Sequence, residues 1–145
     1  MKISTKGRYA LQLMLDIALQ PSNRPVALKD VSKRQNISFK YLEQIMPALT
    51  GAGLIRSVRG PKGGYYINKD LDAITVGDIL RLTEGSLAPV DQVDSDLHTI
   101  PSDSLDTIDI MVWQKLYKAI CDVVDHVTIQ DLVDQERSNG GEYYI

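Results

Sequence analysis

The most distinctive chemistry in this 145-residue chain lies in a loop that combines two cations with three glycines. The loop reads Arg59-Gly60-Pro61-Lys62-Gly63-Gly64, and runs typical of short β-strands flank it at 54–58 and 65–67. A glycine-rich hairpin tip is narrow, so Arg59 and Lys62 can enter a DNA minor groove, where narrow tracts concentrate negative potential. The alternative is an ordinary Gly-rich turn.

A second set of polar side chains opens a predicted helix at Ser38. Ser38, Lys40 and Gln44 can offer hydrogen bonds to base edges or phosphates, and Glu43 can accept one from a cytosine amino group. The second helix of a helix-turn-helix places its N-terminal part in the major groove. We therefore expect these residues, together with Phe39, to contact DNA. The alternative for Lys40 is a merely solvated side chain.

The charge of the chain is divided between its two halves. Residues 1–69 hold twelve Lys and Arg but three Asp and Glu, whereas residues 70–145 hold four and sixteen. The balances of +9 and −12 give the net charge of −3, and this asymmetry favours a polyanion-binding module over two solvated faces. The cations expected to contact mainly phosphate, which gives affinity rather than sequence choice, are Lys2, Lys6, Arg8, Arg24 and Lys33.

Two short helices are predicted ahead of these residues. The first, capped by Thr5, is broken by the prolines of residues 21–25, and its apolar positions recur at helical spacing. That stripe consists of Ala10, Leu13, Met14, Ile17 and Ala18. The second helix spans residues 28–35 and ends at Asn36, a residue type that tolerates the positive φ of a turn.

The third helix is the one that would carry the base-reading side chains. Ser38 can cap it, Gly51 and Gly53 end it, and Pro47 is expected to bend or loosen it because proline removes a backbone hydrogen bond. Three helices followed by a β-hairpin is the order of a winged helix-turn-helix. The sequence therefore predicts a mainly α fold with a small β-hairpin wing.

The second half of the chain predicts a long helix behind an acidic loop. A Thr-x-x-Asp capping box at 75–78 opens a helix through Leu82, and residues 85–106 are polar and acidic. From about Ser104 a long helix shows one apolar stripe, and a short helix follows at 128–133. The stripe includes Ile108, Val112, Leu116, Ile120, Val123 and Val127.

Several classes of protein are disfavoured by composition. The single cysteine, Cys121, permits neither an internal disulfide nor a Cys-x-x-Cys metal or redox motif, and a buried structural role is its default. Two histidines and one cysteine form no convergent nucleophile and base, so we expect no enzyme. The aspartates of 91–106 lack the glycine and glutamate of an EF-hand, so we expect no metal. Without a signal peptide or a membrane-length apolar run, a cytoplasmic protein is expected.

Several motifs together resemble one family of bacterial regulators. They are residues 1–10, then Tyr41-Leu42-Glu43-Gln44, then Gly53-Leu54-Ile55 and Val58-Arg59-Gly60-Pro61-Lys62-Gly63-Gly64-Tyr65. These segments resemble the Rrf-two (Rrf2) family of winged-helix transcription regulators, and the resemblance covers nearly the whole chain. It implies a homodimer formed through the long-helix stripe, a third helix that reads the major groove of an operator, and Arg59 in the minor groove.

The resemblance also divides the chain into functional regions. Residues 1–70 correspond to the winged helix-turn-helix DNA-binding domain, residues 71–137 to an effector and dimerisation region, and residues 138–145 to a flexible tail. Family members that bind an iron–sulfur cluster carry three cysteines in the loop before the long helix. Residues 85–106 contain none, so no cluster is expected.

The tail resembles that of the cysteine-metabolism branch of the family. It ends Tyr143-Tyr144-Ile145, and the branch implies that cysteine synthase binds this tail, with the carboxylate captured in place of a substrate carboxylate. The prediction is a homodimeric, sequence-specific repressor of cysteine or sulfur metabolism that acts through cysteine synthase. One alternative is a cluster-free regulator that responds to redox or stress. Another is a protein-interaction inhibitor without DNA binding, and the tail could also be a frayed terminus or pack on its own dimer.

Overall fold

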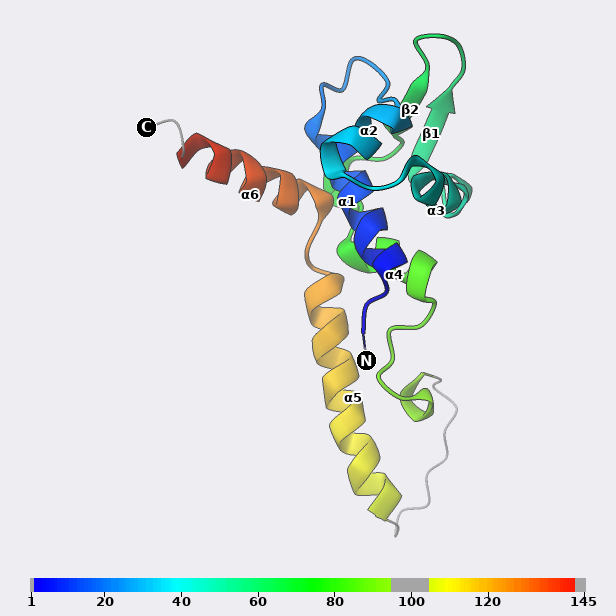
Figure 1. The fold of residues 1–145 in the computed structure, drawn as a ribbon. Coiled ribbons are helices and arrows are strands. Elements are labelled where there is room, and N and C mark those ends of the chain that lie inside the picture. The colour runs from blue at the N-terminus through cyan, green and yellow to red at the C-terminus, as the bar shows by residue number, and fades with distance from the viewer. Residues whose placement is uncertain (1, 95–104, 143–145) are drawn as a thin grey trace.

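The computed structural model describes residues 2–94 and 105–142 and confirms a mainly helical fold with one β-hairpin (Figure 1). Its elements are α1 (Thr5–Leu19), α2 (Leu28–Gln35), α3 (Phe39–Gly51), β1 (Ile55–Val58), β2 (Gly64–Ile67), η1 (Leu71–Ala73), α4 (Val76–Glu84), η2 (Asp91–Val93), α5 (Leu105–Val124) and α6 (Ile129–Glu142). We call the body formed by α1 to α4 and the hairpin the head. From this head α5 extends as a long stalk, and α6 projects to one side (Figure 1).

Helix α1 is the central element of the head. Its predicted stripe is buried throughout, with Leu13 and Met14 fully inaccessible. The N-cap, however, is Ser4 and not Thr5, because the Ser4 Oγ accepts the backbone N–H of Gly7 at 3.0 Å. Both positions carry a hydroxyl that can cap a helix, so composition alone left this one-residue ambiguity.

Helices α2 and α3 form the predicted helix-turn-helix. Asn36 takes a left-handed conformation with φ 53°, and the Ser38 Oγ accepts the backbone N–H of Tyr41 at 3.1 Å to cap α3. The expected loosening at Pro47 is not seen, since α3 continues to Gly51. The hydroxyl of Thr50 donates to the carbonyl of Met46, the residue before the proline, at 3.0 Å.

The hairpin that follows pairs β1 with β2 in an antiparallel register that sets Ile55 opposite Ile67. A third segment, which the sequence analysis did not identify, joins its edge. Val26 and Tyr65 exchange both backbone hydrogen bonds, at 2.9 and 2.8 Å. The hairpin is therefore fastened to the segment that leads into α2, and the wing and the helix-turn-helix form one unit.

A single apolar core unites the head with the start of α6. Ile129 and Val133 are fully buried in the same cluster as Leu13 and Leu42. The core thus crosses the boundary expected at residue 70. In the described residues, no helix combines the length and the apolar character needed to cross a membrane.

Capping boxes begin both α4 and α6. The predicted box of Thr75 and Asp78 is confirmed, and Thr128 forms a second one with Asp131 through two hydrogen bonds of 3.0 Å. The residues before the two helices pair as a short antiparallel bridge. Val127, predicted on the long helix, lies instead in this bridge, because α5 ends at Val124 and the Val127 carbonyl accepts the N–H of Val76 at 2.9 Å.

Helix α6 is longer than the short helix predicted for 128–133. It continues through residues 138–142, where a flexible tail was expected. Side-chain hydrogen bonds four residues apart support it, from Gln130 to Asp134 at 2.8 Å and from Gln135 to Asn139 at 3.3 Å. The predicted partner-binding residues 143–145 lie outside the described residues.

A bidentate ion pair joins α4 to the stalk. The guanidinium of Arg81 donates to both oxygens of Asp125, at 2.5 and 3.0 Å, and this hydrogen bonding lowers the pKa of the Asp125 carboxyl. Gly77 makes the close approach possible, since a Cβ there would lie 2.2 Å from the carboxylate of Asp125 and 2.7 Å from Arg81. The angle between head and stalk thus depends on a glycine next to an ion pair.

We predict that Gly77→Ala destabilises the protein by about 1–3 kcal/mol, because the added methyl group must displace the ion pair and this outweighs the better helix propensity of alanine. Urea unfolding followed by circular dichroism measures the effect. The matched control is Gly51→Ala, where a Cβ meets nothing within 4 Å, and its stability should be unchanged or slightly higher. Equal stability of the two variants would contradict this account of the contact.

Candidate nucleic-acid interface

The residues predicted to read bases lie on the exposed face of α3. Lys40, Glu43 and Gln44 are exposed, and Phe39 at the start of the helix leaves 44% of its surface accessible. Leu42, Ile45 and Leu49 on the opposite face are buried in the core. The amphipathic pattern of α3 therefore presents the polar residues outward from a fixed helix.

Ser38 has a structural role in addition to the one predicted for it. Its Oγ already accepts the N–H of Tyr41, so the hydroxyl hydrogen and one lone pair remain for a contact with DNA. Tyr41 in turn packs edge-to-face on Tyr9 of α1, with ring centroids 5.3 Å apart and planes at 81°. This contact fixes the start of α3 against α1.

The wing, residues 55–67, presents its predicted cations at an exposed tip. Arg59 and Lys62 both lie in the exposed loop between β1 and β2. Next to this loop, Gly64 packs so closely on the neighbouring segment that a Cβ would lie 2.5 Å from the carbonyl oxygen of Val26. The glycine therefore allows β2 to pack directly against the backbone of Val26, while the charged tip remains exposed.

The wing also contains a cation that the sequence analysis did not select. The guanidinium of Arg56 lies over the ring of Tyr66, 4.4 Å from its centroid, and the two residues are directly opposite in the hairpin register. Stacking of this kind holds an arginine in place at the surface. A cross-strand Arg–Tyr pair could have been found by writing the two strands in register.

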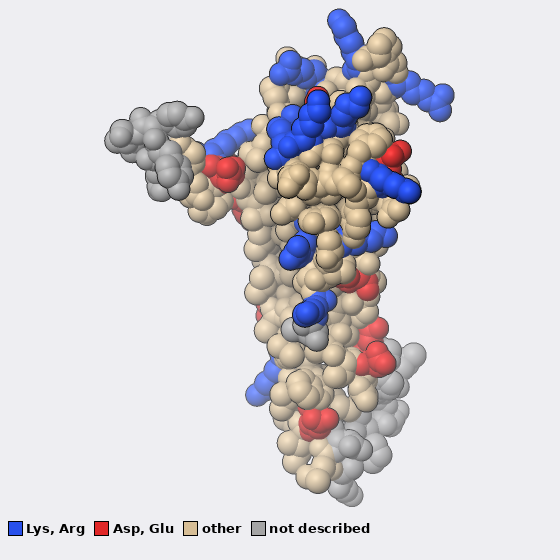
Figure 2. Space-filling model, viewed as in Figure 1, with Lys and Arg blue, Asp and Glu red and all other residues tan. Residues whose placement is uncertain are grey.

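Positive charge gathers on the head. In Figure 2 the Lys and Arg side chains lie mainly over the head and wing, whereas most of the visible Asp and Glu lie on α6 and over the lower half of the molecule. Lys2 and Arg8 are exposed and Lys6 is half-buried at the start of α1. This end of α1 lies away from the wing tip (Figure 1). The predicted phosphate-contacting cations therefore form an extended surface and not a single cluster.

One buried carboxylate supports the helix-turn-helix from inside, and sequence reasoning missed it. Asp16 of α1 has 1% of its side chain exposed. It accepts hydrogen bonds from Arg34 Nε and Nη2, at 3.0 and 2.7 Å, and from Gln35 Nε2 at 2.7 Å. The hydrogen bonding of Arg34 to Asp16 raises the pKa of the Arg34 guanidinium. The charge of Arg34 is therefore engaged within the head.

The predicted dimerisation residues lie along the stalk with different degrees of exposure. Ile108, Val112 and Val123 are 64%, 54% and 62% exposed. Leu116 and Ile120 are half-buried. Leu105 and Met111 are also exposed, whereas Ile110 is buried. An exposed apolar surface of this extent marks a site for association with another protein surface.

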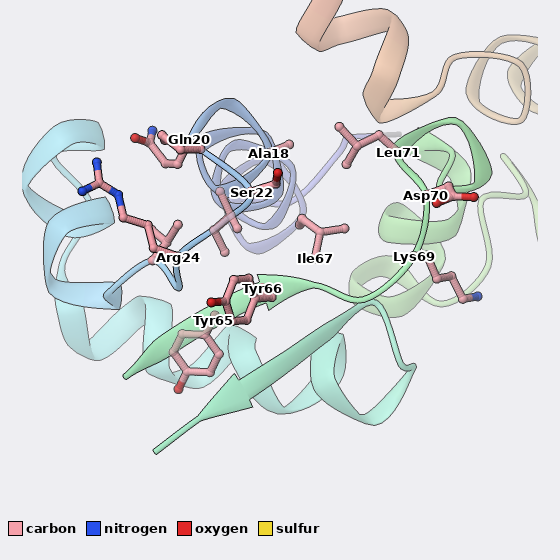
Figure 3. A pocket seen from close by; sticks show the side chains of 13 residues that line it. Ala18, Gln20, Ser22, Arg24, Tyr65, Tyr66, Ile67, Lys69, Asp70 and Leu71 are labelled. Atoms are coloured by element: carbon pink, nitrogen blue, oxygen red, sulfur yellow. The ribbon is translucent and has the colours of Figure 1, made fainter. Parts of the chain in front are cut away.

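A small hollow of about 240 Å³ lies beside the wing, between the end of α1, the loop after it and β2 (Figure 3). Arg24 and Gln20 lie at one end of it, and Ile67 and Leu71 lie farther along. Neither histidine nor cysteine is among its lining residues. The hollow therefore offers no thiol nucleophile and no imidazole base.

The donor set for a metal centre is also poor. In residues 2–94 and 105–142, no three His, Cys, Asp or Glu side chains are grouped to hold a metal ion. Cys121 is half-buried on α5, and its Sγ lies 3.6 Å from the guanidinium of Arg81. A sequence with one cysteine does not fit an iron–sulfur cluster, which is usually held by four thiolate or histidine ligands.

Comparison with known proteins identifies the family to which this chain belongs. A family model described as Rrf2, an iron-dependent transcriptional regulator, matches residues 3–135. The chain belongs to the Rrf2 family. The HTH-type transcriptional regulator CymR of Bacillus subtilis is 38% identical over 132 residues, which are 91% of this chain and 89% of CymR. The regulator IscR of Erwinia tasmaniensis is 38% identical over 94% of this chain and 81% of IscR.

The Rrf2 assignment agrees with a solved structure. That of CymR, described as the global cysteine regulator of B. subtilis, matches with a TM-score of 0.79 at 37% identity and covers 93% of this chain and 98% of CymR. The winged-helix fold predicted from sequence is therefore confirmed. The relatives are named transcription regulators and not enzymes, so the chain is a transcription regulator of the Rrf2 family.

Proposed function

We propose that this Rrf2 protein is a homodimeric, sequence-specific repressor that binds a partly palindromic operator in the cytoplasm. The observation that carries the proposal is the combination of an exposed polar face on α3 with an exposed cationic wing, both fixed to one positively charged head. A dimer bound at an operator excludes RNA polymerase, and the effect is repression.

The mode of binding follows from the exposed chemistry. The start of α3 enters the major groove, where Lys40 and Gln44 donate to base edges or phosphates and Glu43 accepts from cytosine. Phe39, being partly exposed, suits contact with a thymine methyl group. Arg59 enters the minor groove from the wing, and Lys62 contacts the neighbouring phosphates.

We predict that Arg59→Ala and Lys40→Ala each weaken binding to the duplex that the wild-type chain selects from a random-sequence library, by about 1–3 kcal/mol where a base contact is lost. Fluorescence anisotropy at several salt concentrations measures this, and loss of a phosphate contact also lowers the salt slope by about one. Lys118→Ala, which removes a cation from the stalk, is the control and should bind normally. Unchanged binding by both head variants would contradict this DNA-binding surface, whereas a wild-type chain that selects no duplex would favour the interaction module without DNA binding.

The exposed stripe on the stalk supports the homodimer. Ile108, Val112 and Val123 present apolar surface along the same helix that carries the two half-buried members, Leu116 and Ile120. Burying this surface against a second stalk removes it from water, which favours association by roughly 25 cal/mol for each Å² of apolar surface. Two heads carried by paired stalks suit two half-sites of an operator.

We predict that Val112→Asp shifts the protein from dimer to monomer at micromolar concentration, because a carboxylate in an apolar interface lacks a partner. Sedimentation velocity measures the change. Gln114→Asp introduces the same charge on an exposed residue off the stripe, so it should remain dimeric. A wild-type monomer, or a dimer that tolerates Val112→Asp, would contradict the stalk interface.

We further propose that the protein works without an iron–sulfur cluster, although IscR relatives share its fold family. One cysteine cannot supply the ligands of a cluster within a subunit. The residues present thus argue for regulation by another signal.

The signal that we propose is sulfur status. It is supported by the similarity to the cysteine regulator CymR and by the Tyr143-Tyr144-Ile145 sequence, an aromatic and aliphatic segment suited to capture by cysteine synthase. The synthase acts as corepressor by stabilising the DNA-bound form, and its substrate precursor releases it.

We predict that deletion of Ile145 abolishes capture of cysteine synthase from cell lysate while operator binding by the isolated chain is retained. Mass spectrometry of the bound proteins, with recovery of bound DNA, measures both properties. Truncation of 142–145 should give the same result. Full capture of the synthase by the truncated chain would contradict the sulfur-sensing proposal and leave the DNA-binding proposal in place.

A further inference from the structure

The head contains one charged side chain that is buried. Asp16 lies on α1, and its carboxylate receives three hydrogen bonds from two consecutive residues, Arg34 and Gln35. Arg34 binds it in a bidentate fork, which fixes direction as well as distance. We call these three residues the Asp16 clamp.

The Asp16 clamp acts on the end of α2 that leads into the turn. Gln35 is the last residue of α2, Asn36 turns the chain with φ 53°, and Ser38 caps α3 two residues later. Across the turn, Ser32 and Ile37 are joined by two hydrogen bonds, from the Ser32 hydroxyl at 2.5 Å and from the Ile37 N–H at 3.2 Å. A displacement of the end of α2 is thereby transmitted to the start of α3.

The apolar anchors within α2 lie near its start. The helix has eight residues, of which two, Leu28 and Val31, are buried, and both lie in its first half. Apolar packing is non-directional and leaves rotation about the helix axis weakly constrained. The Asp16 side chain is 1% exposed and that of Arg34 is 39% exposed, so desolvation of the carboxylate offsets part of the attraction between the two groups. Such a pair contributes little net stability, and its best-attested use is to fix one arrangement among several.

We infer that Asp16 is a positioning residue for DNA recognition: its fork with Arg34 and its bond to Gln35 fix the angle at which α3 meets the major groove. This inference rests on the proposed DNA-binding function and adds a determinant of specificity that touches no base. It separates the roles of neighbouring cations, because Arg34 orients the recognition helix while exposed Lys33 is free to meet phosphate.

The test compares Asp16→Asn and Arg34→Lys with the wild-type chain on two duplexes, the library-selected one and a scrambled version of it. Arg34→Lys keeps the positive charge but loses the fork. All measurements are made where circular dichroism shows each variant folded. We expect about a tenfold loss of affinity for the selected duplex, comparable to losing one base contact, and unchanged affinity for the scrambled one.

Ile129→Val is the stability control, since it removes one methyl group from the fully buried core at α6 and leaves the residues of α2 unchanged. It should lower the urea midpoint and keep the ratio of the two affinities. The inference is overturned if the clamp variants also keep that ratio, if they weaken both duplexes equally as loss of a phosphate contact would, or if neither variant folds. A wild-type chain that does not distinguish the duplexes overturns the proposed function, and this inference with it.

Discussion

The burial of α1 on several sides is the constraint on which the rest of the structure depends. One stripe of this helix packs against the helix-turn-helix, while α4 and α6 cover it elsewhere, and all of them share one apolar core. Helix α1 therefore sets the positions of the recognition helix, the wing and the end of the stalk that meets the head. The proposed dimer, which presents two heads at a fixed spacing, needs such a shared support.

Charge is arranged around this core with a clear division. The head carries many cations. One of them, Arg34, forms an ion pair with Asp16 and thereby positions α2 on α1. On the stalk side the principal ion pair, Arg81 with Asp125, is likewise used to fix an angle between helices. The polar interactions of this protein thus orient elements that apolar packing holds together, and the exposed cations remain for a polyanion.

Much of the fold could be predicted because its signals are local. Apolar residues at helical spacing, the cap at Ser38 and the turn at Asn36 each act within a few positions. The Asp16 clamp could not be predicted in this way, since Arg34 and Gln35 lie 18 and 19 residues after Asp16 in the sequence. The length of α6 was underestimated because Gly140 and Gly141 have poor helix propensity, which polar side-chain pairs offset. The strand-like pairing of Val26 is a single bridge and leaves no period-two pattern.

The burial of Ile129 and Val133 within the head has a consequence for biosynthesis. Residues 1–70 leave the ribosome first, yet their core stays open until these two side chains, more than 50 positions later, have been made. Closing the core requires contacts between distant parts of the chain, which form late because of the entropy of the intervening loop. A nascent chain therefore cannot complete the core of its head until α6 has been made.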